Sequence, residues 1–289
     1  MINCDNCKKA DVVLLGANYD RTSSFGKGAD KGPQAVVEAA IKQLEFYDRI
    51  TGFEPLDTLK ICYLDLGDLN NLSAEEMIEK VESAYRPLLS EGRFVVLLGG
   101  EHSVSNGAFR AWAGLGVAGD ITILQIDAHL DLREDDSDFE HPPHGRYSHC
   151  TVMRRAADLG FPAAQVGIRI YAKEEMDFAR QKGLTVFEWG RGKVPEISDI
   201  LASISTDMVY LSVDVDGIDP AYMPATGTPV QGGLEWWYTI DLLHAVCSEK
   251  TVIGADITEV APRPYDVLTE YGAAQICFNI IAHTFHRSP

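Results

Sequence analysis

The chain has 289 residues, of which 46% are hydrophobic, and a formal net charge of −18. This length can bury a substantial core, and the acidity argues against a nucleic-acid partner, because phosphate binding needs clustered Lys and Arg. A cationic ligand suits such a chain, although acidity that serves only solubility would look the same. No apolar run has the length of a transmembrane helix and residues 1–5 lack a signal-peptide pattern, so we expect no membrane partner and a cytoplasmic location.

Apolar runs alternate with amphipathic stretches along the chain, which indicates strands alternating with helices. Strands are predicted at residues 12–16, 61–66, 93–98, 121–127, 164–168, 184–187, 207–214 and 251–256. Helices are predicted at residues 32–40, 73–90, 103–113, 148–158, 173–182, 196–204, 233–247 and 266–286. This pattern favours an α/β fold of three layers (α/β/α), with a mostly parallel sheet of about eight strands between the helices. No linker or repeat divides the chain, so we expect a single domain over residues 1–289, with residues 1–10 as an N-terminal extension.

Three metal-binding side chains follow the apolar run 121–126 at every second position, namely Asp127, His129 and Asp131. In an extended strand alternate side chains share a face, so these three would form one row of ligands. A second apolar strand, predicted at 207–214, ends in the same way with carboxylates at positions 214 and 216. Either motif alone is equally compatible with a solvated turn.

The two motifs together favour a shared metal centre. Their four aspartates would repel one another strongly without cations, because nearby like charges disfavour joint ionisation. A third apolar strand, 93–98, runs into GGEHS at 99–103 and offers His102 as a further ligand. Function in parallel sheets collects at the carboxyl ends of the strands, so we expect His102, Asp127 and Asp214 in one cleft.

These segments resemble the ureohydrolase family of arginases, agmatinases and guanidino-acid hydrolases. The resemblance extends from about residue 11 to the C-terminus. It rests on GGEHS at 99–103, DAHLD at 127–131, SVDVDGIDP at 212–220, PATGTP at 224–229 and DITEVAP at 256–262. DAHLDLR followed by SHCT at 148–151 is most similar to the agmatinase branch. Two features depart from that branch: Cys150, where SHG or SHA is usual, and the long segment 134–147.

The resemblance implies a binuclear manganese centre in which Asp127 and Asp214 bridge two Mn²⁺ ions. The implied ligands of one ion are His102, Asp127, Asp131 and Asp214, and those of the other are Asp127, His129, Asp214 and Asp216. Carboxylates and imidazoles without a thiolate suit Mn²⁺, and Co²⁺, Ni²⁺ or Fe²⁺ remain open. The resemblance also implies a homo-oligomer, a trimer or a hexamer.

The resemblance gives catalytic roles to two further residues. The resonance-stabilised guanidinium resists attack by ordinary water, so the expected nucleophile is a metal-bridging hydroxide, and the leaving amine then needs a proton. His149 is the expected source of that proton, although Ser148 could also make it a helix-start residue behind an N-cap. Glu259 is expected to accept hydrogen bonds from the substrate guanidinium. Asp256 stays unassigned, although it could be a buried structural carboxylate that bonds to backbone. Loop, surface or packing roles are expected for His141, His144, His244, His283 and His286.

The predicted reaction is the hydrolysis of agmatine to putrescine and urea. Acidic residues between Asp131 and His149 favour a cationic substrate tail, yet Arg133 or Arg146 could capture a carboxylate. Guanidinobutyrase, guanidinopropionase, arginase and formiminoglutamase activities therefore remain alternatives. A metal-dependent deacetylase is the alternative from a different class, and a non-enzymatic metal-binding protein is a third.

Six cysteines, at positions 4, 7, 62, 150, 247 and 277, do not suggest a disulfide framework in a chain of this length. Most are expected to be reduced thiols in or near the core. Cys4 and Cys7 form a C-x-x-C pattern without a second pair, which favours a mobile or packed N-terminus over a redox or metal site.

Overall fold

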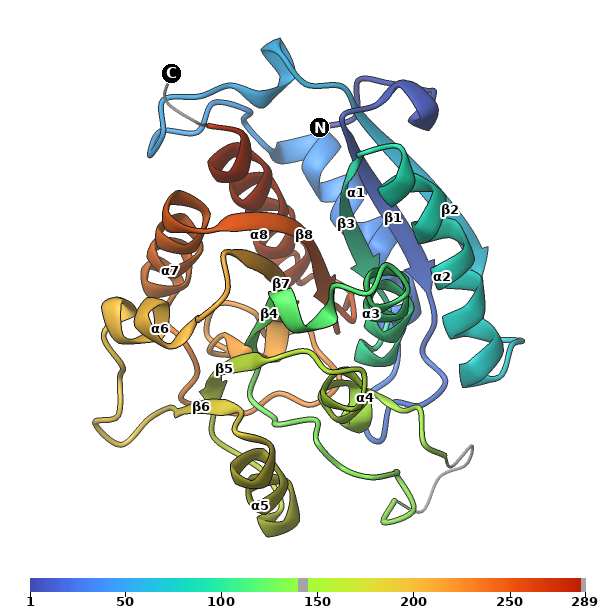
Figure 1. The fold of residues 1–289 in the computed structure, drawn as a ribbon. Helices are drawn as coiled ribbons and strands as arrows, with labels where there is room; N and C mark the ends of the chain where they lie inside the picture. Colours follow the sequence, from blue (N-terminus) through green and yellow to red (C-terminus); the bar gives the residue numbers. More distant parts are fainter. Residues whose placement is uncertain (140–144, 287–289) are drawn as a thin grey trace.

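The computed structural model describes residues 1–139 and 145–286. Its centre is a sheet of eight strands in the order β2-β1-β3-β8-β7-β4-β5-β6, and every neighbouring pair is parallel (Figure 1). The strands are β1 (Val12–Asn18), β2 (Ile61–Asp68), β3 (Phe94–Gly99), β4 (Ile121–Ile126), β5 (Ala163–Ile168), β6 (Thr185–Glu188), β7 (Met208–Asp214) and β8 (Thr251–Thr258). All eight predicted strands are present, and the sheet is wholly rather than mostly parallel.

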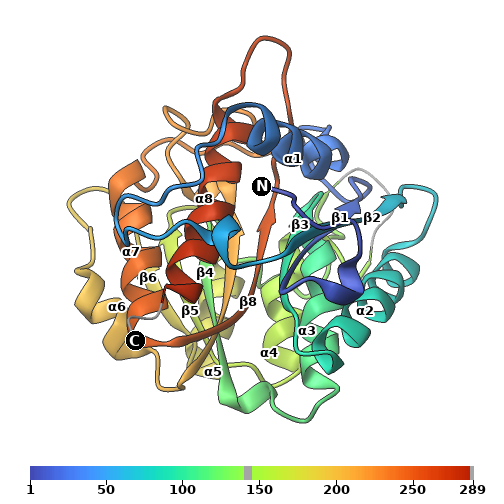
Figure 2. The same ribbon diagram turned by 90° about the horizontal axis from the view of Figure 1, so that it is seen from above.

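Helices cover both faces of this sheet, as Figures 1 and 2 show from two directions. One face packs against α1 (Gly32–Gln43), α6 (Ile197–Ser203), α7 (Trp236–Glu249) and α8 (Leu268–Phe285). The other face packs against α2 (Ala74–Ser90), α3 (Ser105–Ala113), α4 (Val152–Asp158) and α5 (Lys173–Lys182). Among the described residues, no helix combines the length and the apolarity that crossing a membrane requires.

Alternating side chains within the strands produce the three layers. In β1, Val12 and Leu14 belong to the hydrophobic cluster on one face, whereas Val13 and Leu15 belong to the cluster on the other. All four side chains are fully buried. Because both faces are covered, the strands read as continuous apolar runs, and the predicted three-layer fold is confirmed.

Four neighbouring central strands carry the candidate site. β3, β8, β7 and β4 lie side by side in that order and run in the same direction. Just beyond their carboxyl ends stand His102, Glu259, Asp216 and Asp127, respectively. Segments that are far apart in the sequence therefore meet at the carboxyl ends of the central strands.

The N-terminal segment is packed against the edge strand β2. The backbone N–H groups of Asn3 and Cys4 donate to the carbonyl of Ile61, and Cys7 forms a disulfide with Cys62 on β2. The expectation of reduced thiols is therefore wrong for this pair. Its partners are 55 residues apart and meet only through the fold, which a C-x-x-C pattern does not encode. The other cysteines are free thiols: Cys4, Cys150, Cys247 and Cys277.

Candidate metal centre

The residues of the first motif lie beyond strand β4 and not within it. The strand ends at Ile126, and Asp131 adopts the left-handed region with φ of 52°. The expected extended row of Asp127, His129 and Asp131 is therefore wrong. Positive φ is uncommon outside glycine and concentrates at functional sites. Here the turned backbone lets Asp127 and Asp131 approach His102, which follows strand β3.

His102 is the centre of a first group of candidate ligands. Its Nδ1 lies 3.3 Å from Asp127 Oδ2, 3.1 Å from Asp131 Oδ2 and 3.4 Å from Asp214 Oδ2. This nitrogen is buried and has no hydrogen-bond partner among the described residues. An imidazole nitrogen surrounded by carboxylate oxygens is a donor set that suits a divalent transition metal such as Mn²⁺.

His129 forms a second group beside the first. Its Nδ1 lies 3.1 Å from Asp216 Oδ2 and 3.4 Å from Asp127 Oδ1. Asp127 therefore turns one carboxylate oxygen toward each histidine, which is the arrangement of a bridging ligand. Asp214 instead turns Oδ2 toward the first group, while its Oδ1 accepts the backbone N–H of Asp216 at 2.9 Å.

The carboxylates of the two groups disfavour one another's ionisation. Burial, reinforced by the charge of Asp127, raises the pKa of Asp131 to about 7. Burial and the charge of Asp216 likewise raise the pKa of Asp214 well above its usual range. The pKa of Asp127 is lowered, because its contacts with His102 and His129 outweigh the opposing effect of burial. Positive charge between the groups would relieve this repulsion.

A relay of buried hydrogen bonds holds the Nε2 side of the His102 imidazole. The sequence motifs did not reveal it. His102 Nε2 lies 3.0 Å from Ser212 Oγ, which donates to Asp256 Oδ1 at 2.8 Å. Ser212 and Asp256 are fully buried and face each other across the β7–β8 ladder. The relay directs Nδ1 of His102 toward the aspartates, as partners behind metal-binding histidines commonly do. Asp256, which the sequence left unassigned, is buried and accepts from this side-chain hydroxyl.

His149 and Glu259 flank the two groups. His149 begins a 3₁₀ turn and donates its backbone N–H to Thr22 Oγ1 at 3.1 Å. Glu259 follows β8 with φ of 65°, and its Oε1 accepts the backbone N–H of His102 at 2.9 Å. The same oxygen lies 3.9 Å from His149 Nδ1.

The imidazole of His149 is neutral at neutral pH. Burial, reinforced by the charges of His129 and His102, lowers its pKa to about 3. Its buried Nε2 has no hydrogen-bond partner among the described residues. A neutral, unpartnered nitrogen beside the two groups can accept a proton before it donates one.

A cavity of about 330 Å³ opens onto these residues. Its lining includes five residues of the candidate site: His129, Asp131, His149, Asp214 and Asp216. The rest of the lining consists of Ser24, Arg133, Phe139, Cys150, Ile170, Tyr171, Ala172, Glu175 and Thr228. As expected, the segment after Asp131 contributes to the mouth, through Arg133 and Phe139. Residues 140–144, with His141 and His144, lie outside the described residues.

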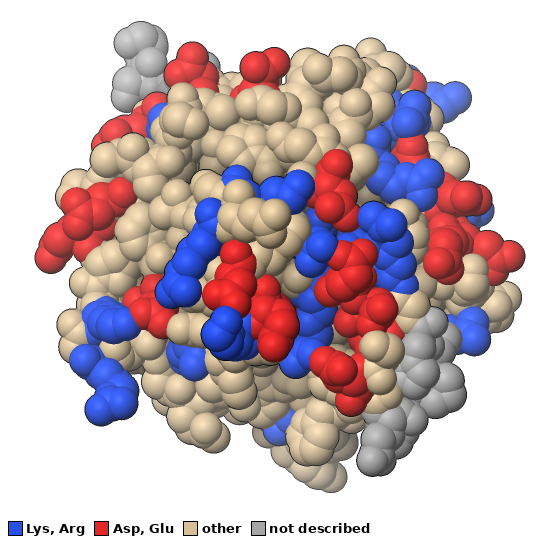
Figure 3. Space-filling view, turned by 60° about the horizontal axis from the view of Figure 1, so that its bottom comes forward, with Lys and Arg blue, Asp and Glu red and all other residues tan. Residues whose placement is uncertain are grey.

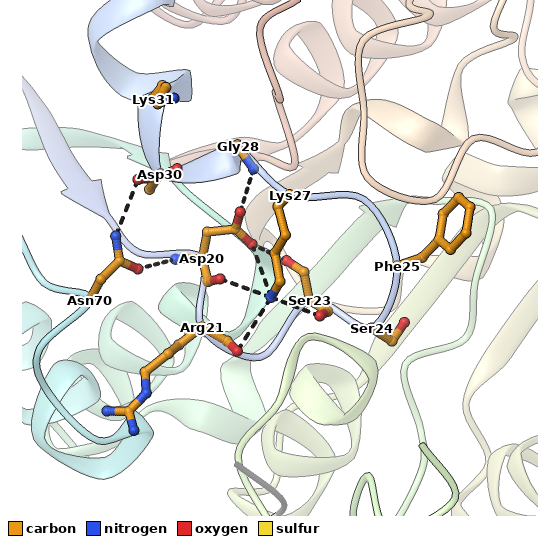
Figure 4. Close-up of a pocket in the computed structure, with 10 residues that line it drawn as sticks. All are labelled: Asp20, Arg21, Ser23, Ser24, Phe25, Lys27, Gly28, Asp30, Lys31 and Asn70. Carbon is orange, nitrogen blue, oxygen red and sulfur yellow. Dashed lines mark hydrogen bonds and ion pairs between the residues drawn. The ribbon is translucent and has the colours of Figure 1, made fainter. Parts of the chain in front are cut away.

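A second hollow, of about 960 Å³, is formed by the loop 20–31 (Figure 4). Within it, Lys27 Nζ points back across the loop and donates to the carbonyls of Asp20 and Ser23. The hollow is larger than the cavity above, but its Lys27 cation is already hydrogen-bonded within the loop. Thr22 on this loop supports His149. The loop therefore serves as scaffold for the candidate site.

The remaining described histidines have packing and surface positions, as expected. The rings of His244 on α7 and His283 on α8 are 4.8 Å apart, and His283 Nε2 lies 3.3 Å from Asp48 Oδ2. His286 follows the last residue of α8. None of the three lines the 330 Å³ cavity.

Known proteins share the architecture and sequence of this chain. The model of the arginase family matches residues 10–283. The chain belongs to the arginase family. This arginase-family protein is 37% identical over 281 residues to the N(1)-aminopropylagmatine ureohydrolase of Synechocystis sp., covering 95% of this chain and 89% of that protein. It is 34% identical over 260 residues to the agmatinase of Bacillus anthracis, covering 88% of this chain and 85% of that protein.

A solved structure agrees with these relatives. The agmatine ureohydrolase of Thermoplasma volcanium has a TM-score of 0.84 and 30% sequence identity, and the match covers 98% of this chain and 92% of that one. The resemblance found in the sequence motifs is thereby confirmed. The arginase-family protein is a ureohydrolase, an enzyme that acts on a small guanidino substrate.

Proposed function

We propose that the enzyme hydrolyses the guanidinium group of agmatine, giving putrescine and urea, with two divalent cations that are Mn²⁺ by preference. One observation carries the proposal. Three carboxylate oxygens surround the buried, unpartnered Nδ1 of His102 within 3.4 Å, while Asp127 turns its second oxygen toward His129. This donor set fits two neighbouring cations that share Asp127.

The proposed ligands follow the two groups. His102, Asp127, Asp131 and Asp214 would hold one cation, and Asp127, His129 and Asp216 would hold the other, with Asp214 as a second bridge by family resemblance. Two bound divalent cations supply Lewis-acid activation of water near neutral pH. The relay through Ser212 and Asp256 keeps Nδ1 of His102 available to the cation.

Glu259 is assigned to binding of the guanidinium, and His149 is assigned to proton transfer. Burial and the charge of Asp214 raise the pKa of Glu259 well above its usual range, so an arriving guanidinium would favour the carboxylate form. Its Oε1 is already used by His102, which leaves Oε2 to accept a guanidinium N–H. Neutral His149 would take up a proton at Nε2 and pass it to the leaving amine.

The cavity favours a cationic substrate tail. Of the two arginines considered for carboxylate capture, Arg133 lines the cavity, whereas Arg146 lies away from it and donates to Asp158 at 2.9 Å. Arg133 is itself neutralised by Asp138. Glu175 adds a buried carboxylate to the lining. A guanidino acid is the second candidate substrate, because Arg133 could exchange Asp138 for a substrate carboxylate.

The proposal is tested by measuring the number of metal ions bound per chain together with the rate of urea release. We expect the Mn²⁺-loaded enzyme to hold two ions per chain and to release urea from agmatine faster than from 4-guanidinobutyrate. Asp127→Asn should lose both ions and nearly all urea release, because it weakens a ligand that both cations share. Asp120→Asn, at an exposed aspartate before β4, is the matched control. One metal per chain with acetate release from acylated amines would point to a deacetylase, and two metals without urea release would overturn the assigned reaction.

The cytoplasmic location and the trimeric or hexameric assembly remain predictions from the sequence and its resemblance. Fractionation and the mass of the native particle in solution would test them. Neither enters the proposed reaction, because every residue assigned to it belongs to one chain.

A further inference from the structure

A further hollow, distinct from that of loop 20–31, adjoins the cavity at the candidate metal centre. It has a volume of about 400 Å³. Three residues, Arg133, Ala172 and Glu175, line both spaces. The remaining lining of this outer hollow consists of Leu132, Glu134, Asp135, Asp138, Arg154 and Glu174. A substrate tail that extended past these shared residues would enter a predominantly acidic space.

The two arginines of the outer hollow are already engaged. Arg133 pairs with Asp138, and Arg154 pairs with Glu134. Glu174 and Glu175 form no salt bridge within the described residues. The hollow therefore presents an excess of negative charge, which would attract an ammonium group rather than a carboxylate.

Glu175 stands at the boundary between the two spaces. Its side chain is 5% exposed, and its oxygens accept the backbone N–H groups of Leu132 at 3.0 Å and Ala172 at 2.8 Å. These bonds hold the carboxylate in place and leave each oxygen a further lone pair. The bond to Ala172 also caps α5, so capping alone would explain the position but not why the side chain lines both spaces.

Ala172 is the smallest side chain in the shared wall. An extended alkyl chain that ran from one space to the other would meet the least bulk beside this methyl group. The inner end of such a path reaches His149, whose buried Nε2 has no partner among the described residues and whose side chain lines the inner cavity. Such a chain would connect the candidate metal centre with the acidic lining of the outer hollow.

On the basis of the proposed function, we infer that the outer hollow is a subsite for a second ammonium group. With the guanidinium at the metal centre, an internal secondary ammonium would lie near Glu175 and a terminal primary ammonium would reach Glu174. Agmatine ends in a single ammonium and fills only the inner cavity. An agmatine extended by an aminopropyl arm, the substrate type in the name of the Synechocystis relative, fills both. The enzyme should therefore prefer the longer substrate.

The test compares urea release from agmatine and from N(1)-aminopropylagmatine with the Mn²⁺-loaded enzyme. We expect kcat/KM to favour the longer substrate by about tenfold, the scale of one added charge-assisted contact. Glu174→Gln should reduce this ratio severalfold, because it removes the charge that meets the terminal ammonium. Ala172→Leu should reduce it further, because the larger side chain narrows the shared wall. Asp177→Asn removes an exposed charge from the same helix outside both spaces, and the ratio should stay at the native value.

The possible outcomes separate this inference from the proposed function. If the loaded enzyme releases urea from neither substrate, the proposed function fails. If agmatine is hydrolysed as well as the longer substrate or better, the inference fails and the proposed function stands. A preference for the longer substrate that Glu174→Gln and Ala172→Leu leave unchanged would place the aminopropyl arm elsewhere, and would also overturn the inference.

Discussion

His149 differs from the candidate ligands because it contributes no donor atom to either group. Its Nε2 is buried and has no hydrogen-bond partner in the part of the chain that the structure describes, and its Nδ1 lies 3.9 Å from Glu259 Oε1. We therefore predict that His149→Phe keeps two metals per chain but lowers kcat for urea release by about 10²-fold or more, the usual scale for a lost positioned proton transfer. His286→Phe, beyond the end of α8, serves as control. Loss of a metal in His149→Phe would instead make this residue a ligand.

At the level of residues, the sequence motifs identified the side chains that converge but not their exact arrangement. His102, Asp127 and Asp214 could be predicted to meet because each lies at or just beyond the carboxyl end of a strand in a parallel sheet. The left-handed backbone at Asp131 could not be predicted, because it depends on the contacts that surround it. The position of Ser212 could have been inferred from the sequence, because it lies two residues before Asp214 on a strand whose alternate side chains share a face. Its partner Asp256 becomes clear only once β7 and β8 are known to be neighbours.

At the level of elements, His283 is buried between helices, and its burial makes the stability of the protein depend on pH. His283 on α8 lies against Asp48, in the connection between α1 and β2, and against His244 on α7. Burial, reinforced by the charge of His244 and opposed by Asp48, lowers its pKa from 6.5 to about 4. Folding therefore excludes a proton that the unfolded chain binds below pH 6.5.

The sign of the effect on stability follows from this difference. Between pH 6.5 and about 4, the unfolded state carries more protons than the native state at this residue, so the free energy of unfolding falls as the pH falls. We predict that His283→Gln, although less stable at pH 7, loses less stability between pH 7 and pH 5 than the native protein does. Urea denaturation at both pH values measures this, with Asp120→Asn, at an exposed aspartate, as control. Equal losses in both proteins would show that His283 does not contribute.

Element types were more predictable than element ends. All eight strands and eight α-helices were anticipated, because continuous apolar strands and amphipathic helices have distinct patterns. Strand β4 was expected to include residue 127 but ends at Ile126, and the helix expected from 148 begins as a 3₁₀ turn before α4. Both differences fall at the candidate metal centre, where contacts between side chains outweigh local preference. The link from Cys7 to Cys62 was missed for a related reason, because it joins segments that only the fold brings together.

At the scale of the molecule, the net charge does not describe how the charged side chains are distributed over the surface. The formal net charge is −18, yet acidic and basic side chains are interspersed on the face that Figure 3 shows. Local ion pairs such as Arg133 with Asp138 therefore set the detail of the mouth. The net charge sets the field at longer range, where a diffusing substrate first meets the protein.

The long-range field makes a prediction that is independent of any single residue. A dicationic substrate such as agmatine is attracted to an acidic protein, and salt weakens this attraction by shortening the Debye length from about 30 Å at 0.01 M to about 3 Å at 1 M. We predict that kcat/KM for agmatine falls severalfold over this range, mainly through a higher KM. The value of kcat is the internal control, because the saturated enzyme no longer depends on substrate capture. A kcat/KM that stays constant or rises with salt would show that the acidity serves solubility and not capture of the substrate.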